Sequence, residues 1–347
     1  MPLFRHTVRP VSDSGPYLPS GFRALVHPLG PLFRHLPLSL RRHILFLRHR
    51  GRWGNFRTPR GFGEKMQWRI LNDRRGLMSW TADKLAQKEY VRHVMKVSGQ
   101  PRLLEIPETL WVGSDIADLQ SRAHQLPADW VFKPNHSCSR FRLFGQSGSG
   151  LTQPNWEELA NLSSEWSDHD EEKYVMGHWA YSKARIGMIA EQRIGGSVRP
   201  EELKLLCFNG RVHSMMAQEG MGTDTWSVAY YNRSFTQVSS GWEREIPVGQ
   251  HSLGSRLSKE LQEQIVYAAE LLTAPFDFTR IDFYLYEEKI WFGELTTYSG
   301  GGLVAVSDEL DLDRGAHWQL PDLQELDPRE GEWWALLEAP MIGTLQR

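Results

Sequence analysis

The stretch FDFTRIDFYLYEEKIWFGELTTYSGGGL, residues 276–303, constrains the fold more than any other part of the chain. Its residues alternate between apolar and polar and many are aromatic, which predicts two β-strands at residues 278–286 and 290–296. A short polar turn separates these strands, so we expect an antiparallel hairpin. Side chains along a strand point alternately to its two faces, so the pairing register decides which of them meet.

The register of this hairpin decides whether two acidic residues meet. With residues 287–289 as the loop, Tyr286 pairs with Ile290, and Asp282 lies opposite Glu294 on one face. A two-residue loop would shift the register and put the carboxylates on opposite faces. Our prediction takes the three-residue loop.

Opposed carboxylates indicate a cation between them. Directly opposed side chains lie roughly 5 Å apart at Cβ, where like charges repel. Mg²⁺ takes one or two carboxylates together with substrate phosphates, so it would relieve this repulsion. Arg280 lies on the same face, and the glycines at 300–302 follow as a flexible loop of free backbone N–H groups suited to an anion. The alternative is a solvated face that carries two acids, and spacing alone leaves both interpretations open.

The chain of 347 residues is long enough for two or three structural units. Hydrophobic residues make up 40% and charged residues 24%, which is typical of a globular protein in water. Cys138 and Cys207 are too few for a disulfide framework, and no Cys/His cluster has zinc-site spacing, so we expect a cytoplasmic protein. We find no signal peptide and no apolar run near the ~20 residues that span a bilayer.

Residues 1–60 form a basic arm with eleven Arg, no Lys and one acid, Asp13, a formal charge of +10. The whole chain carries −2, so the remainder carries −12. Within residues 31–50, apolar residues recur at helical spacing between Arg and His, and Pro37 limits the helix. One interpretation is contact with an anionic membrane or lipid-linked glycan at the inner membrane face, and nucleic acid is not the expected partner. We favour the other, a helix packed on the body with its arginines in solvent.

Lys133 follows the apolar strand predicted at residues 130–132 and begins the loop KPNHSCSR. A lysine at a strand end can hold a phosphate by its charge, together with N–H groups of the following turn. Phosphate loops usually rely on Gly, and none lies between Lys133 and Arg142. A thiol nucleophile at Cys138 with His136 as its base is the weaker alternative, because no third orienting group is in view.

A second lysine lies on the strand before Asn209-Gly210, a strong hairpin-turn signal. Lys204 alternates with Leu203 and Leu205, so it points to the opposite face from them. The alternative is an ordinary lysine on an edge strand. Residues 257–274 then predict an amphipathic helix that leads into the acidic hairpin.

In their order and spacing, six stretches resemble the ATP-grasp superfamily, and within it the teichuronopeptide-biosynthesis (TupA-like) branch. They are GFGEKMQWRILNDR, TADKLAQKEYV, WVFKPNHS, MIAEQRI, EELKLLCFNG and FTRIDFYLYEEKIWFGELTTYSGGG, and they span residues 61 to about 320. The resemblance implies an α+β fold in which two α+β lobes grip ATP, preceded by a smaller α/β domain. The implied units are the basic arm with its amphipathic helix at 1–60, the α/β domain at 61–128, the first lobe at 129–194, the second lobe with the metal-binding hairpin at 195–321, and an acidic tail at 322–347.

The resemblance also implies a site for ATP and Mg²⁺. Asp282, Glu294 and Thr296 would hold Mg²⁺, and Arg280 would stabilise charge on the transferred phosphoryl group or the tetrahedral intermediate. The residues implied for ATP are Lys84, Lys133, His136, Ser137, Ser139, Glu191, Gln192, Ile194 and Lys204. Lys204 would also act in catalysis, loop 135–140 would be a mobile flap over the phosphates, and residues 191–194 would be a hinge whose backbone reads the adenine edge.

The chain departs from the family pattern at two places. Many ATP-grasp enzymes have Asn two residues after the metal-binding Glu, where this chain has Thr296. Thr is typical of the TupA-like branch, and its hydroxyl can still ligate Mg²⁺. The flap reads HSCSR where the branch usually has His-Gly-Ser-Gly, and loss of both glycines hinders close approach of the backbone to phosphates. This change implies altered flap geometry, slow turnover or a degenerate site.

The activity implied is carboxylate–amine ligation, in which ATP phosphorylates a carboxylate and an amine then displaces phosphate to form an amide. By the same resemblance, the acid is a uronic acid or amino acid in surface-polysaccharide or glycoconjugate assembly, and the amine is an amino acid or another amine. The expected location is the cytoplasm, including the inner membrane face. Three alternatives stay open: a kinase of a sugar or other hydroxyl, a non-catalytic nucleotide- or glycan-binding module, and an adaptor that docks RNA or a membrane through the arm.

Overall fold

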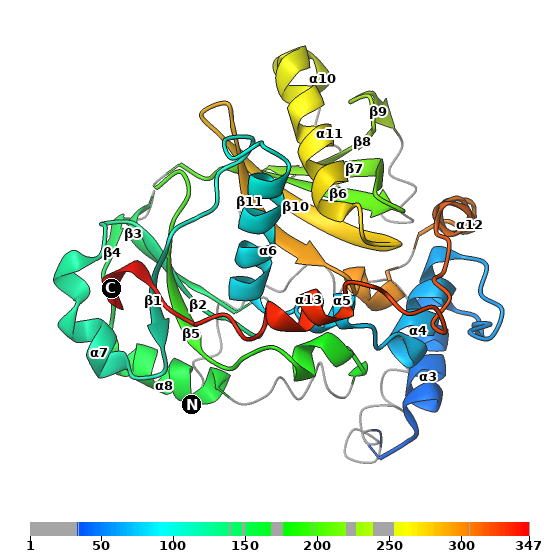
Figure 1. The fold of residues 1–347 in the computed structure, drawn as a ribbon, viewed down its shortest axis with the longest axis horizontal. Coiled ribbons are helices and arrows are strands. Elements are labelled where there is room, and N and C mark those ends of the chain that lie inside the picture. Colours follow the sequence, from blue (N-terminus) through cyan, green and yellow to red (C-terminus); the bar gives the residue numbers. More distant parts are fainter. Residues whose placement is uncertain are drawn as a thin grey trace.

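The computed structural model describes residues 33, 35–138, 140–147, 150–167, 176–196, 198–219, 227–238, 253–304 and 306–346. Figure 1 shows two antiparallel β-sheets with helices packed on and between them. The predicted α+β class is therefore confirmed.

The first sheet has five antiparallel strands in the order β1-β5-β2-β3-β4. The strands are β1 (Thr109–Gly113), β2 (Trp130–Pro134), β3 (Arg142–Ser147), β4 (Gly150–Thr152) and β5 (Met188–Gln192). Helices α7 (Ile116–Ser121) and α8 (Trp156–Trp166) contact each other and share a hydrophobic core with the sheet. Trp111, Trp130 and Phe132 are buried in this core, which holds the sheet and helices together as one lobe.

The second sheet has six antiparallel strands in the order β11-β10-β6-β7-β8-β9. The strands are β6 (Glu201–Phe208), β7 (Arg211–Glu219), β8 (Ser227–Asn232), β9 (Gln237–Val238), β10 (Phe278–Tyr286) and β11 (Lys289–Thr296). The predicted turn joins β6 to β7, with φ of 49° at Asn209 and 70° at Gly210. Helices α10 (Leu253–Arg256) and α11 (Lys259–Thr273) follow, and α11 buries the predicted stripe of Leu261, Ile265, Ala268 and Leu272 in the core.

The remaining helices join the two sheets and cover their ends. They are α3 (Leu38–Arg50), α4 (Phe62–Asn72), α5 (Gly76–Ser79), α6 (Lys84–Val97), α12 (Asp308–His317) and α13 (Glu330–Ala335), with 3₁₀ helices at Ala123–Gln125, Trp179–Ser182, Ser299–Gly302 and Thr344–Gln346. Asp83 caps α6 by accepting from Ala86 N at 2.9 Å. Gln87 of α6 exchanges hydrogen bonds with both the N–H and the C=O of Leu295, at 2.8 and 3.1 Å. Helix α6 thereby satisfies part of the open edge of β11.

The predicted α/β domain at residues 61–128 has no sheet of its own among the residues that the structure describes. Its strand β1 pairs with β5 in the first sheet, while helices α4 and α6 contact the glycine-rich loop and β11. The first four residues of β1 are all buried, so this strand requires cover on both faces. The first sheet therefore begins well before the predicted boundary at residue 129.

Helix α3 begins directly after Pro37 and packs on the body of the protein. Its arginines do not all face solvent as predicted, because Arg42 is fully buried and donates to the carbonyl of Gly301 at 2.7 Å. Arg50 lies 3.1 Å from the carboxylate of Asp311. Arginines of the arm thus fix the helix to the glycine-rich loop and α12. Residues 1–32 lie outside the described residues, so a contact between them and an anionic surface stays a prediction.

The segment after residue 321 contacts both lobes. Trp333 of α13 is buried beside Trp80 in the core of the second lobe. From α13 the chain runs across to the first sheet, as the red segment in Figure 1 shows. There Leu345 packs on the core, and its carbonyl accepts from Arg122 at 2.7 Å. The tail is therefore a strap between the lobes.

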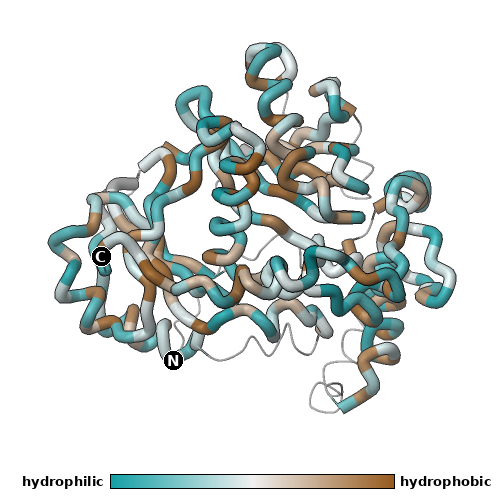
Figure 2. Tube along the Cα trace, in the orientation of Figure 1, coloured by the Kyte–Doolittle hydropathy of each residue, from teal (hydrophilic) through white to brown (hydrophobic). Residues whose placement is uncertain are grey.

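Figure 2 shows hydrophobic residues interleaved with hydrophilic ones along the helices and strands. This pattern is typical of elements that bury one side in a core. Among the helices that the structure describes, we find none long and apolar enough to cross a membrane.

Candidate active site

The hairpin places Asp282 directly opposite Glu294, as predicted. The predicted loop is wrong, because the turn is the residue pair 287–288 and Lys289 already belongs to β11. A β-bulge inserts Gly293 as an extra residue and restores the register that the shorter turn would have shifted. A Cβ at this position would lie 2.7 Å from the carbonyl oxygen of Asp282, so the bulge requires glycine.

Arg280 holds the predicted metal ligands together. Its Nε and Nη2 donate to the two oxygens of Asp282 at 2.6 and 2.7 Å. The same Nη2 donates to Glu294 Oε1 at 2.9 Å and to Thr296 Oγ1 at 3.1 Å. Three oxygen-bearing side chains therefore converge on one cationic nitrogen.

Lys204 lies on β6, which is an inner strand and not an edge. Its Nζ is 3.1 Å from Asp282 Oδ2 and 2.7 Å from Glu202 Oε1. Burial opposes charge at these groups, yet Arg280 and Lys204 lower the pKa of Asp282, and Asp282 in turn raises the pKa of Lys204. Burial raises the pKa of Glu202. Glu202 was not predicted as a site residue, although its place two residues before Lys204 puts both side chains on one face.

The side chains of Asp282, Glu294 and Thr296 fit a magnesium ion by their chemistry. Mg²⁺ prefers hard oxygen ligands, and carboxylates on adjacent strands supply them. The convergence of these oxygens on Arg280 Nη2 shows that the site accommodates positive charge at this point. A guanidinium and a metal ion cannot share the position, so metal binding requires Arg280 to move away from the oxygens.

A second ionic cluster lies on the first sheet. Lys133 of β2 pairs with Glu191 of β5, and Lys88 of α6 binds the other carboxylate oxygen at 2.5 Å. Burial disfavours charge on Glu191, but Lys133 and Lys88 outweigh it and lower the pKa of Glu191 to about 2. The side chain of Glu191 thus positions two lysines. Lys88 was not predicted, although it lies one helical turn after Lys84 on α6.

A pocket brings residues predicted for ATP next to two of the predicted metal ligands. It is lined by residues that include Lys84, Gln87, Ser137, Cys138, Glu294 and Thr296. Lys84 Nζ donates to the carbonyl of Ser137 and lies 3.4 Å from that of Asn135. Burial, reinforced by Lys133, lowers the pKa of Lys84 to about 8. Residues predicted for phosphate contact therefore share a pocket with predicted metal ligands.

The first half of the predicted flap is buried, since Asn135, His136 and Ser137 are each at most 2% exposed. Asn135 Oδ1 accepts from the N–H of Leu85 at the start of α6 at 3.0 Å. A ring nitrogen of His136 lies 2.8 Å from the carbonyl of Trp166. Ser137 lines the pocket, but His136 does not. The predicted contact at position 139 lies outside the described residues.

The predicted hinge begins at the end of β5, and residues 193–200 connect it to β6 in the other sheet. The N–H of Gln192 donates to Glu108 O at 2.9 Å, and the side chain of Gln192 accepts from Glu108 N at 3.2 Å. Ile194 is half-buried. The amide of Gln192 is therefore engaged within the first lobe, and a backbone contact to adenine would use other groups of the hinge.

The glycine-rich loop after β11 is fixed in place. Gly300, Gly301 and Gly302 have φ of 56°, 58° and 67°, a left-handed conformation that glycine adopts without strain. The carbonyl of Gly301 accepts from Arg42 at 2.7 Å and from Gln67 at 2.9 Å. The N–H of Gly301 donates to Tyr298 O at 2.9 Å. This N–H is therefore not free, contrary to the prediction. Arginine and glutamine side chains from α3 and α4 thus position this loop.

A family described as TupA-like ATP-grasp matches residues 64–318 of the chain. No curated protein matches it. Similar solved structures include D-alanine–D-alanine ligase from Bacillus anthracis, at 12% identity over 63% of this chain and 56% of that one, with a TM-score of 0.34. VanG D-Ala:D-Ser ligase from Enterococcus faecalis has 12% identity over 67% and 61%, with a TM-score of 0.36.

A third similar structure is the ATP-grasp ligase PsnB complexed with a minimal precursor. It has 15% identity over 69% of this chain and 60% of that one, with a TM-score of 0.35. The chain thus spans about three fifths of the length of these structures.

Proposed function

Because the chain belongs to the TupA-like ATP-grasp family, we propose that it is an ATP- and Mg²⁺-dependent ligase that joins a carboxylate to an amine through an acyl phosphate. The observation that carries the proposal is the shared pocket of Lys84, Ser137, Glu294 and Thr296. A phosphate chain needs positive charge on one side and a metal-binding carboxylate on the other, and this pocket supplies them through Lys84 and Glu294.

Lys84 of α6 and Lys133 of the first lobe provide the positive charge for the nucleotide phosphates. Lys84 lies in the pocket, and Lys133 is oriented by its ion pair with Glu191. Because Glu191 is itself ionised and shared with Lys88, the Lys133 ammonium is placed before ATP arrives. Such preorganisation lowers the cost of ordering side chains on binding.

The second lobe provides the metal site and the groups that act on the transferred phosphoryl. Asp282, Glu294 and Thr296 would hold Mg²⁺, which when bound neutralises charge on the phosphate oxygens. Lys204 lies beside these ligands, 3.1 Å from Asp282, and Arg280 donates to Asp282 at 2.6 Å. On metal binding Arg280 would leave these oxygens and, from the same face, stabilise with Lys204 the negative charge that develops during transfer.

The proposed reaction has two displacements. A carboxylate oxygen of the substrate attacks the γ-phosphorus of ATP, the bond to the β,γ-bridging oxygen breaks, and ADP leaves. The amine nitrogen then attacks the acyl carbon, inorganic phosphate leaves, and the nitrogen loses a proton as the amide forms. Neither step requires an enzyme nucleophile, so the residues act by positioning and charge stabilisation.

The substrate class follows from the family and not from the pocket. We propose that the acid is a uronic acid or an amino acid in the assembly of a surface polysaccharide, and that the amine is an amino acid or another amine. Because a uronic acid is anionic, the basic arm at 1–60 would favour its approach at the inner membrane face.

Thermal unfolding with and without Mg-ATP tests the nucleotide–metal site. Mg-ATP at a hundred times its dissociation constant should stabilise the wild type by about 2.7 kcal/mol. The shift should disappear in Asp282→Asn and in Glu294→Gln, and persist in the exposed control Glu325→Gln. Asp282 is buried, so Asp282→Asn could unfold the protein. Glu294 is 39% exposed, so Glu294→Gln should keep the fold and still test the site. Equal shifts in all four proteins would contradict the proposed ligands.

Product analysis then separates the ligase from its alternatives. The ligase releases inorganic phosphate in step with amide formation, and ADP appears only with both substrates or with the acid alone. A kinase would instead yield a stable phosphoester without free phosphate. A non-catalytic binding module would be stabilised by Mg-ATP in the unfolding assay but would form no ADP with any acid, amine or sugar tested.

A further inference from the structure

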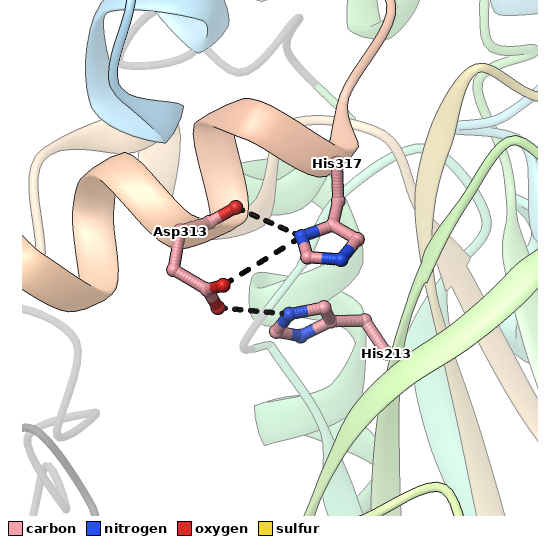
Figure 3. Close-up of side chains that lie close together, drawn as sticks. All are labelled: His213, Asp313 and His317. Atoms are coloured by element: carbon pink, nitrogen blue, oxygen red, sulfur yellow. Dashed lines mark hydrogen bonds and ion pairs between the residues drawn. The ribbon is translucent and has the colours of Figure 1, made fainter.

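Three side chains with metal-binding groups meet outside the proposed ATP site. His213 extends from β7, and Asp313 and His317 from α12, as Figure 3 shows. One potential ligand atom from each lies within 4.8 Å of the others. Within the described part of the chain, this is the one such group of three.

The local structure explains why the three side chains meet. Leu206 of β6 pairs with Ser214, but the next residue, Cys207, pairs with Val212, so His213 is the extra residue of a β-bulge. A bulge re-aims the side chain that it inserts. Asp313 and His317 are four residues apart on α12, which puts them on the same helix face.

The carboxylate of Asp313 lies between the two imidazoles. Its Oδ2 is 3.0 Å from His213 Nε2, and its Oδ1 is 3.7 Å from His317 Nδ1. The ring centroids of His213 and His317 are 4.7 Å apart, with the planes inclined by 64°. The rings therefore approach without stacking flat, with their nitrogens toward a common carboxylate (Figure 3).

The surrounding contacts orient His213 as a ligand. Its Nδ1 lies 3.2 Å from Ser214 Oγ, which leaves Nε2 directed at Asp313. A hydrogen bond to the second ring nitrogen is how proteins commonly fix a metal-binding imidazole. Asn209 in the β6–β7 turn also donates to the carbonyl of His317 at 2.8 Å, so the strand and helix ends are already held together.

We propose that His213, Asp313 and His317 form a site for a divalent transition-metal ion of the zinc class, separate from the magnesium site. Two imidazoles and one carboxylate favour Zn²⁺ or Co²⁺, whereas Mg²⁺ prefers oxygen ligands. Tetrahedral bonds of about 2.1 Å put neighbouring ligand atoms about 3.4 Å apart, so the most distant ligand atoms, now up to 4.8 Å apart, must approach each other. His317 is 56% exposed, so it can exchange its hydrogen bond with the Asp313 carbonyl for the ion.

A bound ion would clamp α12 to the sheet of the second lobe. Helix α12 follows the glycine-rich loop, and Asp311 on this helix accepts from Gly63 N of α4 at 2.9 Å. The helix therefore lies between the sheet and the segments that position the loop. The site fits a structural role, because it would join elements about a hundred residues apart in the sequence.

Metal titration of the tag-free, chelator-stripped full chain tests the proposal. We expect one equivalent of Zn²⁺ to bind and raise the melting temperature without nucleotide. Co²⁺ should bind in its place with the intense visible absorption of a low-coordinate, nitrogen-ligated ion. His317→Ala and Asp313→Asn should each weaken Zn²⁺ binding at least about tenfold. His93→Ala, which removes an exposed histidine of α6 outside the cluster, should change neither the affinity nor the spectrum.

Two outcomes would overturn the site. One is wild-type Zn²⁺ binding no tighter than that of His317→Ala, which would leave the cluster as a hydrogen-bonded network without metal. The other is an equal stabilisation by Mg²⁺ that Asp313→Asn removes, which would show an oxygen-ligand site instead. Both substituted residues are about half exposed, so the variants should fold as the wild type does. The result is independent of the proposed ligase activity, because neither ATP nor substrate is present.

Discussion

The protonation of Lys84 is expected to control ATP affinity near neutral pH. Burial, with Lys133 nearby, lowers the pKa of this lysine to about 8. If the ammonium pairs with a nucleotide phosphate, ATP affinity falls as the pH rises from 7 to 9 and the group loses its charge. A charged hydrogen bond contributes about 1.5–3 kcal/mol, but with a pKa of about 8 the charged fraction of Lys84 falls only about tenfold between pH 7 and 9, so the loss of affinity should approach about tenfold. Calorimetric titration with Mg-ATP at pH 7, 8 and 9 measures it.

The matched control for this prediction is Lys84→Arg. A guanidinium stays charged across this range, so its ATP affinity should depend much less on pH than that of the wild type. Titration of ATP itself affects both proteins equally and cancels in the comparison. The same pH slope in both proteins would assign the effect to another group, such as Lys88, whose pKa burial also lowers to about 8.

Single residues were predictable from the sequence where strand alternation alone decides their face. Alternation put Lys204 on the face opposite Leu203 and Leu205, and Glu202 could have been added by the same rule, whereas the pairing of β6 with β10 that brings Lys204 to Asp282 was not predicted. Arg42 could not be predicted, because the helical pattern shows a basic surface and the partner of this arginine, Gly301, is 259 residues away. Contacts between elements distant in sequence leave no local pattern.

Among the secondary-structure elements, the acidic hairpin shows how a correct pairing can follow from a wrong turn. The three-residue loop and the actual combination of a two-residue turn with a bulge both add one residue to the same strand. Both therefore put Asp282 opposite Glu294. Gly293 is the signal for the bulge, since a glycine within a strand commonly marks one. The loop length itself left no such signal.

A buried ion-pair network at the start of this hairpin should make stability depend on pH. Asp277 accepts from Arg69 at 2.6 Å, from Arg75 at 2.7 Å and from Trp318 Nε1 at 2.6 Å. Burial disfavours its charge, but Arg69 and Arg75 outweigh this and lower the pKa of Asp277. Its stabilisation is therefore complete above the unfolded-state pKa of about 3.9 and is lost as the pH falls through the lower folded-state pKa.

Urea unfolding of Asp277→Asn measures this contribution. At pH 7 the variant should lose about 3–5 kcal/mol of unfolding free energy, because Arg69 remains buried without its closest carboxylate. The difference from the wild type should shrink as the pH is lowered below 4. Asp308→Asn removes a carboxylate that is 81% exposed and should cost less than about 1 kcal/mol. A pH-independent difference for Asp277→Asn would show that lost packing, not charge, is responsible.

At the scale of the whole molecule, the resemblance gave the two-lobe arrangement, whereas the residues alone predicted elements without their assembly. Strand β1 was expected in a separate domain, yet it pairs with β5, which begins 75 residues after β1 ends. Strand pairing over such a separation depends on which apolar faces remain uncovered after the other elements pack. The hydrophobic periodicity within one segment carries no information about those distant faces. The strap formed by the tail is a second case, since its contacts in the first lobe lie over 200 residues away.

This strap should stabilise the first lobe specifically. Leu345 packs on the first-sheet core and Leu326 is 91% exposed, so Leu345→Ala and Leu326→Ala make the same change in opposite surroundings. We expect Leu345→Ala to cost about 1–3 kcal/mol and Leu326→Ala almost nothing. Hydrogen exchange should quicken first in β1 and β5 of the Leu345 variant, and not in β10 and β11. If exchange instead rose equally in both sheets, the two lobes would unfold as one cooperative unit. The contact of Leu345 would then stabilise the whole molecule and not the first lobe alone.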